Sequence, residues 1–386
     1  MTRRNSSLLI LYVASGALQT SLNVAFLTLP IYALAVSASP FEIGLMGAVG
    51  GLTYSLMARL MGGLSDRSSK RNFITIGAAV QAIVSLVYPF CGNISQLIPL
   101  RIVQSLGLAL FWPAIEAMIV ESAQKNKVDR ALVGYNVSWG AASMVGSPFA
   151  GFLITAFFLT LPFYVSSAIA LLVSVMLLAL RNRTGDDPPP MQSKVVAAAD
   201  RPSRFVLFLP MVAAFGYAFN SGIVSTLFPV SATRLSVPAF QIGLLFFLSS
   251  LVQTLVFVFS GKLIRRFGKT SFLIGMVAFT VSLALMAFAK DAVTFAPSFI
   301  GLGLGQGILY SSSLYYLLTE SEKNRGQVTG SFESTLGLAF FLGPFVGGVV
   351  AQFGPSYPYV AGAVVSFIIL VVQIFFRMRP LGKCLD

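Results

Sequence analysis

The chain consists mostly of apolar stretches that are long enough to cross a lipid bilayer. A helix needs about 20 apolar residues to span the hydrocarbon core of a membrane, and such stretches recur along the 386 residues. Only 10% of the residues are charged, against about 25% in soluble domains. So little charge cannot cover the surface of a soluble protein of this size. The sequence therefore predicts an all-α polytopic membrane protein.

The apolar stretches divide into two groups of six around a polar segment. We expect a first six-helix bundle in residues 1–181, a linker in 182–204 and a second six-helix bundle in 205–386. The linker has three consecutive prolines and no apolar run that could span a membrane. The first apolar run exceeds the roughly 7–15 residues of a signal-peptide core, so we expect it to remain as a helix. The expected helices are 7–35, 41–64, 72–92, 96–121, 131–158, 162–180, 205–232, 240–264, 271–289, 293–319, 326–352 and 357–376.

The two halves repeat each other. The segment Gly62–Arg71 reads G-G-L-S-D-R-S-S-K-R and returns at Gly261–Thr270 as G-K-L-I-R-R-F-G-K-T, 199 residues later. The same offset relates Pro30 to Pro229. Six helices are an even number, so both copies enter the membrane from the same side. The pattern predicts a parallel repeat, related by an axis along the membrane normal.

The basic residues lie in alternate loops, which predicts the orientation of the chain. With both termini in the cytoplasm, every Lys and Arg lies on that side except Arg59, Arg101, Arg234 and Lys290. The net charge of +13 then follows from topology and does not indicate a nucleic-acid partner. Cys91 and Cys384 fall on opposite faces, so we expect no disulfide. There is no histidine, so a proton-transfer step would need a carboxylate.

The loop Gly62-x-Leu64-Ser65-Asp66-Arg67-x-x-Lys70-Arg71 resembles the signature loop of the major facilitator superfamily of secondary transporters. It departs from the family pattern at Ser69, where glycine is usual, and its second copy has Arg265 in place of Asp66. The resemblance covers essentially the whole chain. It implies two six-helix bundles with a substrate site between them near mid-membrane, and alternating access by rocking of the bundles.

Two further stretches resemble the drug/proton antiporter branch of this family. Leu97-x-x-x-Arg101-x-x-Gln104-Ser105-x-Gly107 is similar to the pattern of its fourth helix, with Ser105 in place of a glycine. Gly134, Ser147, Pro148 and Gly151 match the spacing of its fifth-helix pattern. Similar small-residue patterns occur in importers, so export is an inference from this resemblance.

The signature loop predicts a gate on the cytoplasmic side. Gly62 would let its helix approach a neighbour closely, and Asp66 would accept hydrogen bonds from a helix N-terminus or pair with an arginine only while that side is closed. A topology-determining loop with solvated charges is the simpler alternative. The gate residues we propose are Gly62, Asp66, Arg67, Lys70, Arg71, Glu121 and Arg130.

Three ionisable residues fall well inside expected helices. Burying a charge in a membrane is costly, so such residues are candidates for function. Glu116 and Glu333 are the carboxylates deep in a span, and a cavity carboxylate can exchange a proton for substrate. The antiporter resemblance implies a proton-coupling role for Arg101. Static pairing with a neighbouring helix is the alternative for each of the three residues.

The resemblance also implies that the first and seventh helices line the cavity. Their polar candidates are Gln19, Asn23, Tyr217 and Asn220. The first helix has no acid, which weakens a claim for cationic substrates. Four prolines within helices are expected to bend them, which would allow the bundles to rock, although packing alone would also explain them. These prolines are Pro30, Pro148, Pro229 and Pro344.

The sequence thus favours a non-enzymatic, monomeric secondary transporter of the cell (cytoplasmic) membrane, without a cofactor or metal. Its partners would be a small-molecule substrate, protons and lipid. The leading hypothesis is proton-coupled, multidrug-type efflux of small, largely apolar organic compounds. The alternatives are uptake or facilitated diffusion of a polar solute such as a sugar or metabolite, and a non-transporting receptor or lipid-handling protein. A nucleotide-binding glycine loop is absent from the sequence, which argues against a primary pump.

Overall fold

A computed structural model describes residues 3–65, 68–123, 128–184, 204–319 and 325–378. Within these ranges the chain forms α helices and one short 3₁₀ turn, Tyr88–Phe90. The helices are α1 (Arg3–Ala35), α2 (Pro40–Ser65), α3 (Lys70–Val87), α4 (Ile94–Ser122), α5 (Val128–Ala156), α6 (Leu161–Thr184), α7 (Arg204–Arg234), α8 (Ala239–Phe267), α9 (Thr270–Phe288), α10 (Ala292–Thr319), α11 (Arg325–Val350) and α12 (Tyr357–Met378).

All twelve helices of the described chain are long and apolar enough to cross a membrane. The predicted fold class, an all-α polytopic protein with twelve spans, is confirmed. The helix ends lie within a few residues of the expected positions. Of the predicted linker, residues 185–203 lie outside the described part, since α6 runs to Thr184 and α7 begins at Arg204.

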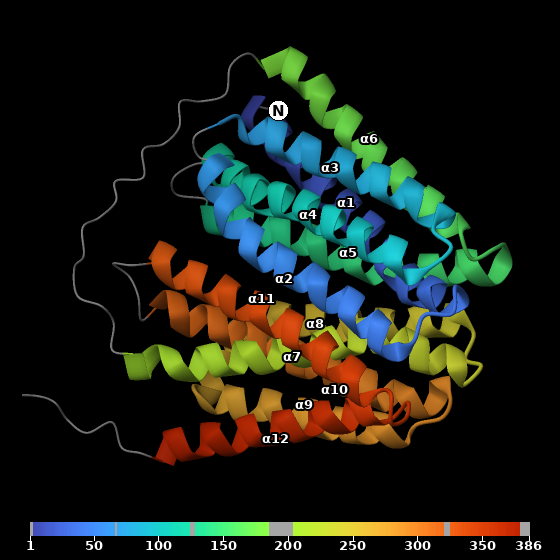
Figure 1. The fold of residues 1–386 in the computed structure, drawn as a ribbon. Coiled ribbons are helices and arrows are strands. Elements are labelled where there is room, and N and C mark those ends of the chain that lie inside the picture. Colours follow the sequence, from blue (N-terminus) through green and yellow to red (C-terminus); the bar gives the residue numbers. More distant parts are fainter. Residues whose placement is uncertain (1–2, 66–67, 124–127, 185–203, 320–324, 379–386) are drawn as a thin grey trace, which may run out of the picture.

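The helices form two groups that lie one against the other, α1–α6 and α7–α12 (Figure 1). We call them the N-terminal and C-terminal bundles. The start of α1, the end of α6, the start of α7 and the end of α12 all lie at one end of the molecule, on the left of Figure 1. We call this end the terminal side and the other end the turn side. The distribution of Lys and Arg along the chain predicts that the terminal side is cytoplasmic.

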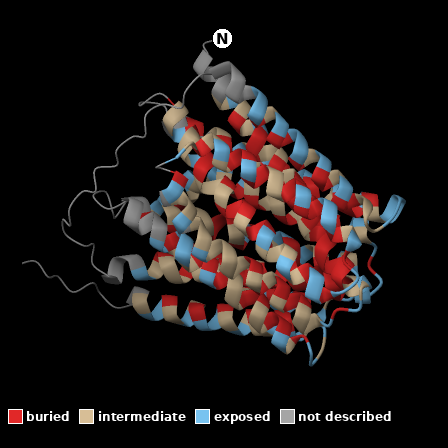
Figure 2. Cartoon of the chain, turned by 45° about the horizontal axis from the view of Figure 1, so that its top comes forward, coloured by how far each residue is buried: buried red, intermediate tan, exposed pale blue. Residues whose placement is uncertain are grey.

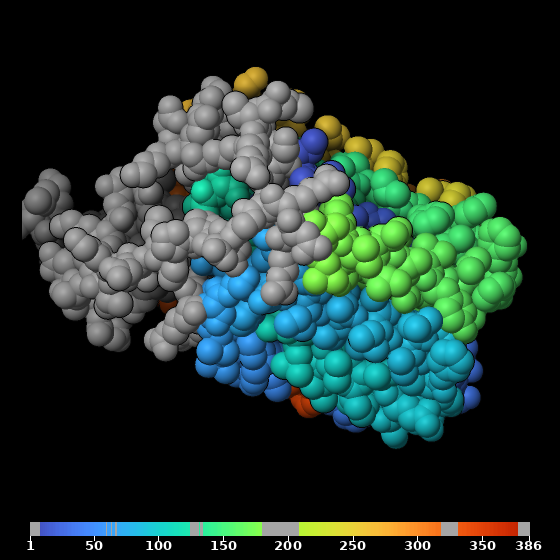
Figure 3. Space-filling model, turned by 90° about the horizontal axis from the view of Figure 1, so that it is seen from above, coloured from blue at the N-terminus to red at the C-terminus, as the bar shows by residue number. Residues whose placement is uncertain are grey.

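Buried residues fill the interior of both bundles, whereas the outward faces of the helices are exposed (Figure 2). Figure 3 shows one such outward face, on which α3 and α6 lie. The exposed side chains on these two helices are large and apolar, as a lipid-facing surface requires. Examples are Ile76 and Ile83 on α3, and Leu171 and Leu172 on α6.

The chain reverses direction on the turn side through short connections that are hydrogen-bonded at helix starts. Ser39 and Glu42 bond reciprocally at the start of α2, with Ser39 N to Glu42 Oε2 at 2.7 Å. Asp291 and Thr294 do the same at α10, with Thr294 N to Asp291 Oδ1 at 2.9 Å. Such reciprocal pairs satisfy backbone N–H groups that a helix start leaves free. They fix where each helix begins.

Two equivalent turns repeat the same backbone conformation. Ser37 precedes α2 with φ of 64° and Ser236 precedes α8 with φ of 60°, 199 positions apart. In each turn the next residue donates its backbone N–H to a carbonyl five positions earlier, Ala38 to Ala33 and Val237 to Ala232. The internal repeat in the sequence therefore extends to single backbone angles.

The two bundles meet through crossed helix pairs, α2 with α11 and α5 with α8. Glycines bring the helices into backbone contact: a Cβ on Gly44 would lie 2.5 Å from the Gly348 Cα, and one on Gly243 would lie 2.6 Å from the Ser147 carbonyl. Small residues are what allow membrane helices to approach this closely. Pro344 and Pro148 lie in these same contacts, against Gly44 and Gly243 respectively.

All four predicted helix-bending prolines lie inside continuous helices. Pro30 is in α1, Pro148 in α5, Pro229 in α7 and Pro344 in α11. Two of them lie at the contact between the bundles. A proline frees the carbonyl four residues earlier, which for Pro344 is Phe340, and this oxygen lies against Gly51 of α2. The bends themselves remain a prediction.

Candidate functional site

The backbone contacts between the bundles extend from the turn side to about the middle of the helices. Toward the terminal side, the glycine contacts between the bundles reach Gly337 of α11, against Ser55 of α2, and Gly140 of α5, against the Thr254 side chain of α8. Glu333 lies four residues before Gly337, one helical turn or about 6 Å further toward the terminal side. Its side chain is exposed. The bundles are thus closed against each other on the turn side, with an accessible carboxylate just past the closure.

Glu116 and Glu333 come from opposite bundles and are close enough for their charges to interact. Glu116 lies on α4, where its Oε1 accepts a hydrogen bond from the Tyr135 hydroxyl of α5 at 3.0 Å. The side chains of both glutamates are exposed. The structure thus brings together the two carboxylates that the sequence places inside spans.

Aromatic side chains from both bundles surround these carboxylates. Tyr54 of α2 and Tyr310 of α10 each interact electrostatically with both Glu116 and Glu333. In the N-terminal bundle the Trp112 and Tyr135 rings are 6.5 Å apart. In the C-terminal bundle Tyr310 packs 5.8 Å from Tyr217 and 5.9 Å from Phe332, between ring centres.

Three of these tyrosines were not predicted as site residues. Tyr54, Tyr135 and Tyr310 do not stand out among apolar neighbours, because a tyrosine is common in any membrane helix. One signal exists for Tyr54, which lies three residues after Gly51 and so continues the face of α2 that contacts α11. Tyr217, a predicted cavity residue, belongs to this aromatic group through its contacts with Tyr310 and Phe340.

Gln19 and Asn23 of α1 form a polar group with α5. The Gln19 amide donates to Asn23 Oδ1 at 3.2 Å and to the Ser143 hydroxyl at 3.5 Å. The Asn23 amide nitrogen is buried and has no hydrogen-bond partner. Gln19 and Asn23 therefore lie together between α1 and α5, and their predicted contact with substrate remains a prediction.

The fourth predicted cavity residue, Asn220, faces elsewhere. Its amide donates to the Ser366 hydroxyl of α12 at 2.8 Å and to the Gly216 carbonyl at 2.7 Å, and the side chain is fully buried. This places Asn220 between α7 and α12, within the C-terminal bundle. The expectation that it lines the space between the bundles is wrong for this conformation, because residue 220 lies on the α12 side of α7.

Arg101 lies inside the N-terminal bundle rather than beside the two carboxylates. Its Nη1 donates to Gln104 Oε1 at 2.6 Å, and its guanidinium lies 4.5 Å from the centre of the Phe26 ring. The Nε atom fills the space beside Gly50 of α2. Arg101 thus joins α1, α2 and α4, and its predicted role in proton coupling is untested by this geometry.

The predicted gate is described only in part. Lys70 at the start of α3 pairs with Glu121 at the end of α4, with 3.0 Å between Nζ and Oε1. Both belong to the N-terminal bundle, so this ion pair ties two of its helices together. Asp66, Arg67 and the Arg130 side chain lie outside the described residues. Arg71 lies in the first turn of α3.

Gly62 does not provide the close helix approach that the sequence predicts. A Cβ at this position would lie 3.6 Å from the Pro113 Cβ, which is ordinary van der Waals contact. The close approaches of α2 are instead at Gly44, Gly47 and Gly51, nearer the turn side. The signature glycine therefore has room to spare in this conformation.

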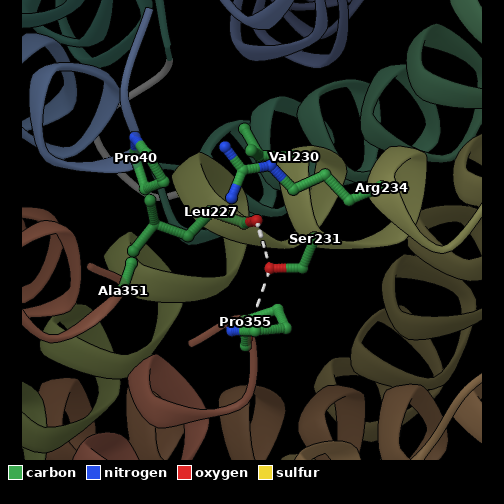
Figure 4. A pocket seen from close by; sticks show the side chains of 7 residues that line it. All are labelled: Pro40, Leu227, Val230, Ser231, Arg234, Ala351 and Pro355. Carbon is green, nitrogen blue, oxygen red and sulfur yellow. Dashed lines mark hydrogen bonds between the residues drawn. The ribbon is translucent and has the colours of Figure 1, made fainter. Parts of the chain in front are cut away.

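On the turn side the remaining space at the bundle contact is minimal. A hollow of about 10 Å³, room for roughly one water molecule, lies where α2 begins, near the ends of α7 and α11 (Figure 4). The Ser231 hydroxyl crosses it and donates to the Leu227 and Pro355 carbonyls. A hollow of this size is too small to hold an organic substrate.

Comparisons with known proteins agree with this architecture. The family model of the Major Facilitator Superfamily matches residues 8–210 and 210–383. The chain is 26% identical to multidrug efflux protein YfmO of Bacillus subtilis, over 92% of this chain and 89% of that protein. It is 21% identical to an uncharacterized MFS-type transporter of Methanocaldococcus jannaschii, over 92% and 94% of the two chains.

Among solved structures, a POT family transporter in complex with 5-aminolevulinic acid superposes with a TM-score of 0.80 at 14% identity, covering 96% of each chain. At this identity the likeness concerns the fold alone. Twelve spans in two repeated bundles that meet closely on the turn side, and a family model that covers both halves, lead to one conclusion: the chain belongs to the Major Facilitator Superfamily and is a membrane transporter.

Proposed function

We propose that this transporter couples proton movement to the export of small, largely apolar organic compounds, with Glu116 and Glu333 as the proton-binding groups. The observation that carries the proposal is the placement of these carboxylates on opposite bundles, both exposed and within range of each other's charge. Two facing negative charges repel, and a proton or a cationic group between them relieves that repulsion.

The surroundings of the carboxylates suit an apolar compound. The rings of Tyr54, Trp112, Tyr217 and Tyr310 offer flat, apolar surfaces with a few hydroxyl groups, which is a common composition of small-molecule sites. The multidrug efflux protein among the relatives supports export as the direction. We further propose that the protein acts as a monomer in the cytoplasmic membrane with its terminal side in the cytoplasm.

In the proposed cycle, the terminal side and the turn side of the space between the bundles close in turn. In the described conformation substrate enters from the terminal side and reaches Glu116 and Glu333. Proton release and substrate binding then favour closure of that side, where Asp66 and Arg67 would act as a latch, and opening of the turn side. Protonation from the turn side would displace the substrate and return the bundles to the described conformation.

The test is proton flux in proteoliposomes of purified protein with an internal pH dye. A panel of hydrophobic cations, neutral drugs, nucleosides and sugars is added to wild type, Glu116→Gln and Glu333→Gln. We expect compound-driven proton movement in wild type and a loss of about tenfold or more in each variant, as for removal of a positioned proton-transfer group. Glu42→Gln is the control, because it makes the same change at a half-buried glutamate on the turn side.

The polar group of Gln19, Asn23 and Ser143 supports one alternative, transport of a polar solute. Its unpartnered Asn23 amide nitrogen would donate to a solute hydroxyl. Sugar or nucleoside transport without proton movement, unchanged in both glutamine variants, would favour facilitated diffusion and contradict the proton-coupled proposal.

A further inference from the structure

A chain of buried amide and hydroxyl groups begins at Arg101 and runs through the N-terminal bundle. The Gln104 Oε1 accepts from Arg101 Nη1 at 2.6 Å and from the Tyr88 hydroxyl at 3.0 Å. The Gln104 Nε2 donates to Gln81 Oε1 of α3 at 3.0 Å. This second bond fixes which end of the Gln104 amide faces Arg101, because only an amide whose nitrogen points to Gln81 can offer its oxygen to a guanidinium.

Gln81 is held in turn by three serines. Its Nε2 lies 3.1 Å from the Ser85 hydroxyl and 3.4 Å from those of Ser21 and Ser166, on α1 and α6. Ser166 also bonds Ser85 at 3.0 Å, and its hydroxyl donates to the Ser21 carbonyl. Gln81, Gln104 and these serines are all buried to 1% exposure or less. We call this set, with Tyr88, the glutamine relay.

The C-terminal bundle forms the same helices with different residues at the positions of Arg101 and the two glutamines. At the 199-residue offset, Arg101, Gln104 and Gln81 correspond to Ile300, Gly303 and Thr280. Gly303 packs against the α8 backbone, and the Thr280 hydroxyl donates to a carbonyl of its own helix, at Met276. Ser85 and Tyr88 correspond to Ala284 and Ala287. Buried polar side chains are costly unless fully bonded, so a set present in one bundle alone calls for a purpose specific to it.

We propose that Gln104 and Gln81 are positioning residues that hold the Arg101 guanidinium at the junction of α1, α2 and α4. In the described chain Arg101 has a neutral amide as its acceptor and no ion pair. A neutral acceptor fixes the position of the guanidinium without neutralising it, so its charge stays available to the transport cycle. Gln81 does not touch Arg101 and acts through the orientation of the Gln104 amide.

This inference rests on the proposed function only where it assigns the Arg101 charge to the transport cycle. The positioning of Arg101 by the two glutamines is tested without a substrate. Protein labelled with ¹⁵N-arginine is reconstituted in lipid nanodiscs, and the Arg101 signals are assigned by their loss in Arg101→Lys. We expect slow rotation of the Arg101 Nη groups in wild type. In Gln104→Met and Gln81→Met the rotation accelerates by about tenfold or more, as for loss of a charge-assisted hydrogen bond.

Two further variants separate positioning from general packing. Gln81→Thr installs the residue of the equivalent position in the C-terminal bundle and is expected to free Arg101 as Gln81→Met does, with less risk to folding. Thr280→Val makes a polar-to-apolar change at that equivalent position and should leave the Arg101 signals as in wild type. Unchanged Arg101 rotation in a folded Gln81 variant would overturn the proposal.

The functional arm uses the proteoliposome assay. If the relay acts through Arg101, Gln81→Thr alone lowers the transport rate. Added to Arg101→Gln, the same substitution causes no further loss of transport. Equal losses in both backgrounds would assign Gln81 to bundle packing alone. Absence of proton coupling in wild type would contradict the proposed function, whereas the rotation measurement would still decide the positioning role.

Discussion

At the scale of single residues, glycines decide how closely the bundles meet. Gly44 and Gly348 lie backbone to backbone at the turn side, whereas a Cβ on Gly62, in the sequence segment most typical of the family, would make only an ordinary van der Waals contact with Pro113. The sequence pattern marks all three alike. These glycines differ in the residue that faces each of them, which is far away in the sequence. Gly44 faces α11 of the other bundle, whereas Gly62 faces Pro113 of its own bundle.

We predict that Gly44→Ala weakens the turn-side closure. The new Cβ would meet the Gly348 Cα at 2.5 Å and the Pro344 carbonyl at 2.6 Å, and overpacking of this kind costs about 1–3 kcal/mol. Separating α2 from α11 relieves it. Spin labels at Ser95 and Val293, exposed positions near the turn side of the two bundles, should report a distance distribution shifted to longer values by electron–electron resonance.

Gly62→Ala is the matched control for this experiment. Its Cβ would meet only Pro113 at 3.6 Å, so the label distances should stay as in wild type. An unchanged distribution in Gly44→Ala would mean that the closure does not depend on this glycine contact.

The type of a residue decided whether its place in the site could be predicted from the sequence. Glu116, Glu333 and Arg101 stand out in a sequence because charge in a membrane helix is rare. The tyrosines do not stand out, and Asn220 was placed on the wrong face of α7. Lipid and protein interior are both apolar, so a spanning helix is apolar on all sides and its pattern hardly indicates which side faces which neighbour.

At the scale of helices, the sequence determines well where each helix begins and ends. It does not determine how each helix is rotated about its own axis. Hydrophobic length fixes where each span begins and ends, and polar residues at helix starts make those ends definite. Ser39 and Glu42, Asn93 and Gln96, and Asp291 and Thr294 provide such starts on the turn side. These pairs are visible in the sequence, whereas the positive φ of Ser37 and Ser236 is not.

We predict a pH-dependent contribution of Asp291 to stability. Hydrogen bonds from the backbone N–H of Thr294, and further ones from its hydroxyl, lower the pKa of the exposed Asp291 carboxyl. A lowered pKa in the folded state means that the stabilisation is present above the ordinary aspartate pKa and is lost as the pH falls through the lowered value.

The measurement is thermal unfolding of wild type and Asp291→Ala in detergent at neutral and acidic pH. We expect a Tm lower by about 1 °C in the variant at neutral pH, since a single cap is a small part of the unfolding free energy of a long chain. The difference should shrink in acid. Asp291→Asn keeps a side-chain acceptor, so its Tm should fall less than that of Asp291→Ala. A Tm difference between wild type and Asp291→Ala that grows in acid would contradict the stabilising role of the Asp291 carboxylate.

At the scale of the whole molecule, the repeat explains why the bundle contacts are crossed. Equivalent helices of the two halves make equivalent contacts: α2 with α11, and α8 with α5. The 199-residue offset was sufficient to predict two like bundles. The crossed pairing was not predictable from it, because the repeat relates each position of one half to its equivalent in the other half and carries no information on which helix faces meet.

We predict that linking the bundles on the closed side stops transport. In Gly140→Cys/Thr254→Cys the two side chains lie across the α5–α8 contact, where a Cβ on Gly140 would be 3.3 Å from the Thr254 hydroxyl. Oxidation should form a disulfide and abolish transport in proteoliposomes, and reduction should restore it, because alternating access requires these helices to separate.

A pair within one bundle serves as the control. Ser271 of α9 and Ser312 of α10 have hydroxyls 2.9 Å apart, so Ser271→Cys/Ser312→Cys should also oxidise. Bundles that move as rigid bodies tolerate this link, and transport should continue. Loss of transport in both double variants would argue for motion inside the bundles instead.

The equivalent turns at Ser37 and Ser236 have a consequence for binder selection. Each joins a helix of one bundle's interior to a helix of the bundle contact, and each holds a fixed backbone shape in a few residues. A single-domain antibody raised against the turn side would find little mobile chain to bind there. One whose footprint covers both turns would touch both bundles at once, so it would recognise one conformation. In the proposed orientation, with the turn side outside the cell, it would report on intact cells which way the transporter faces.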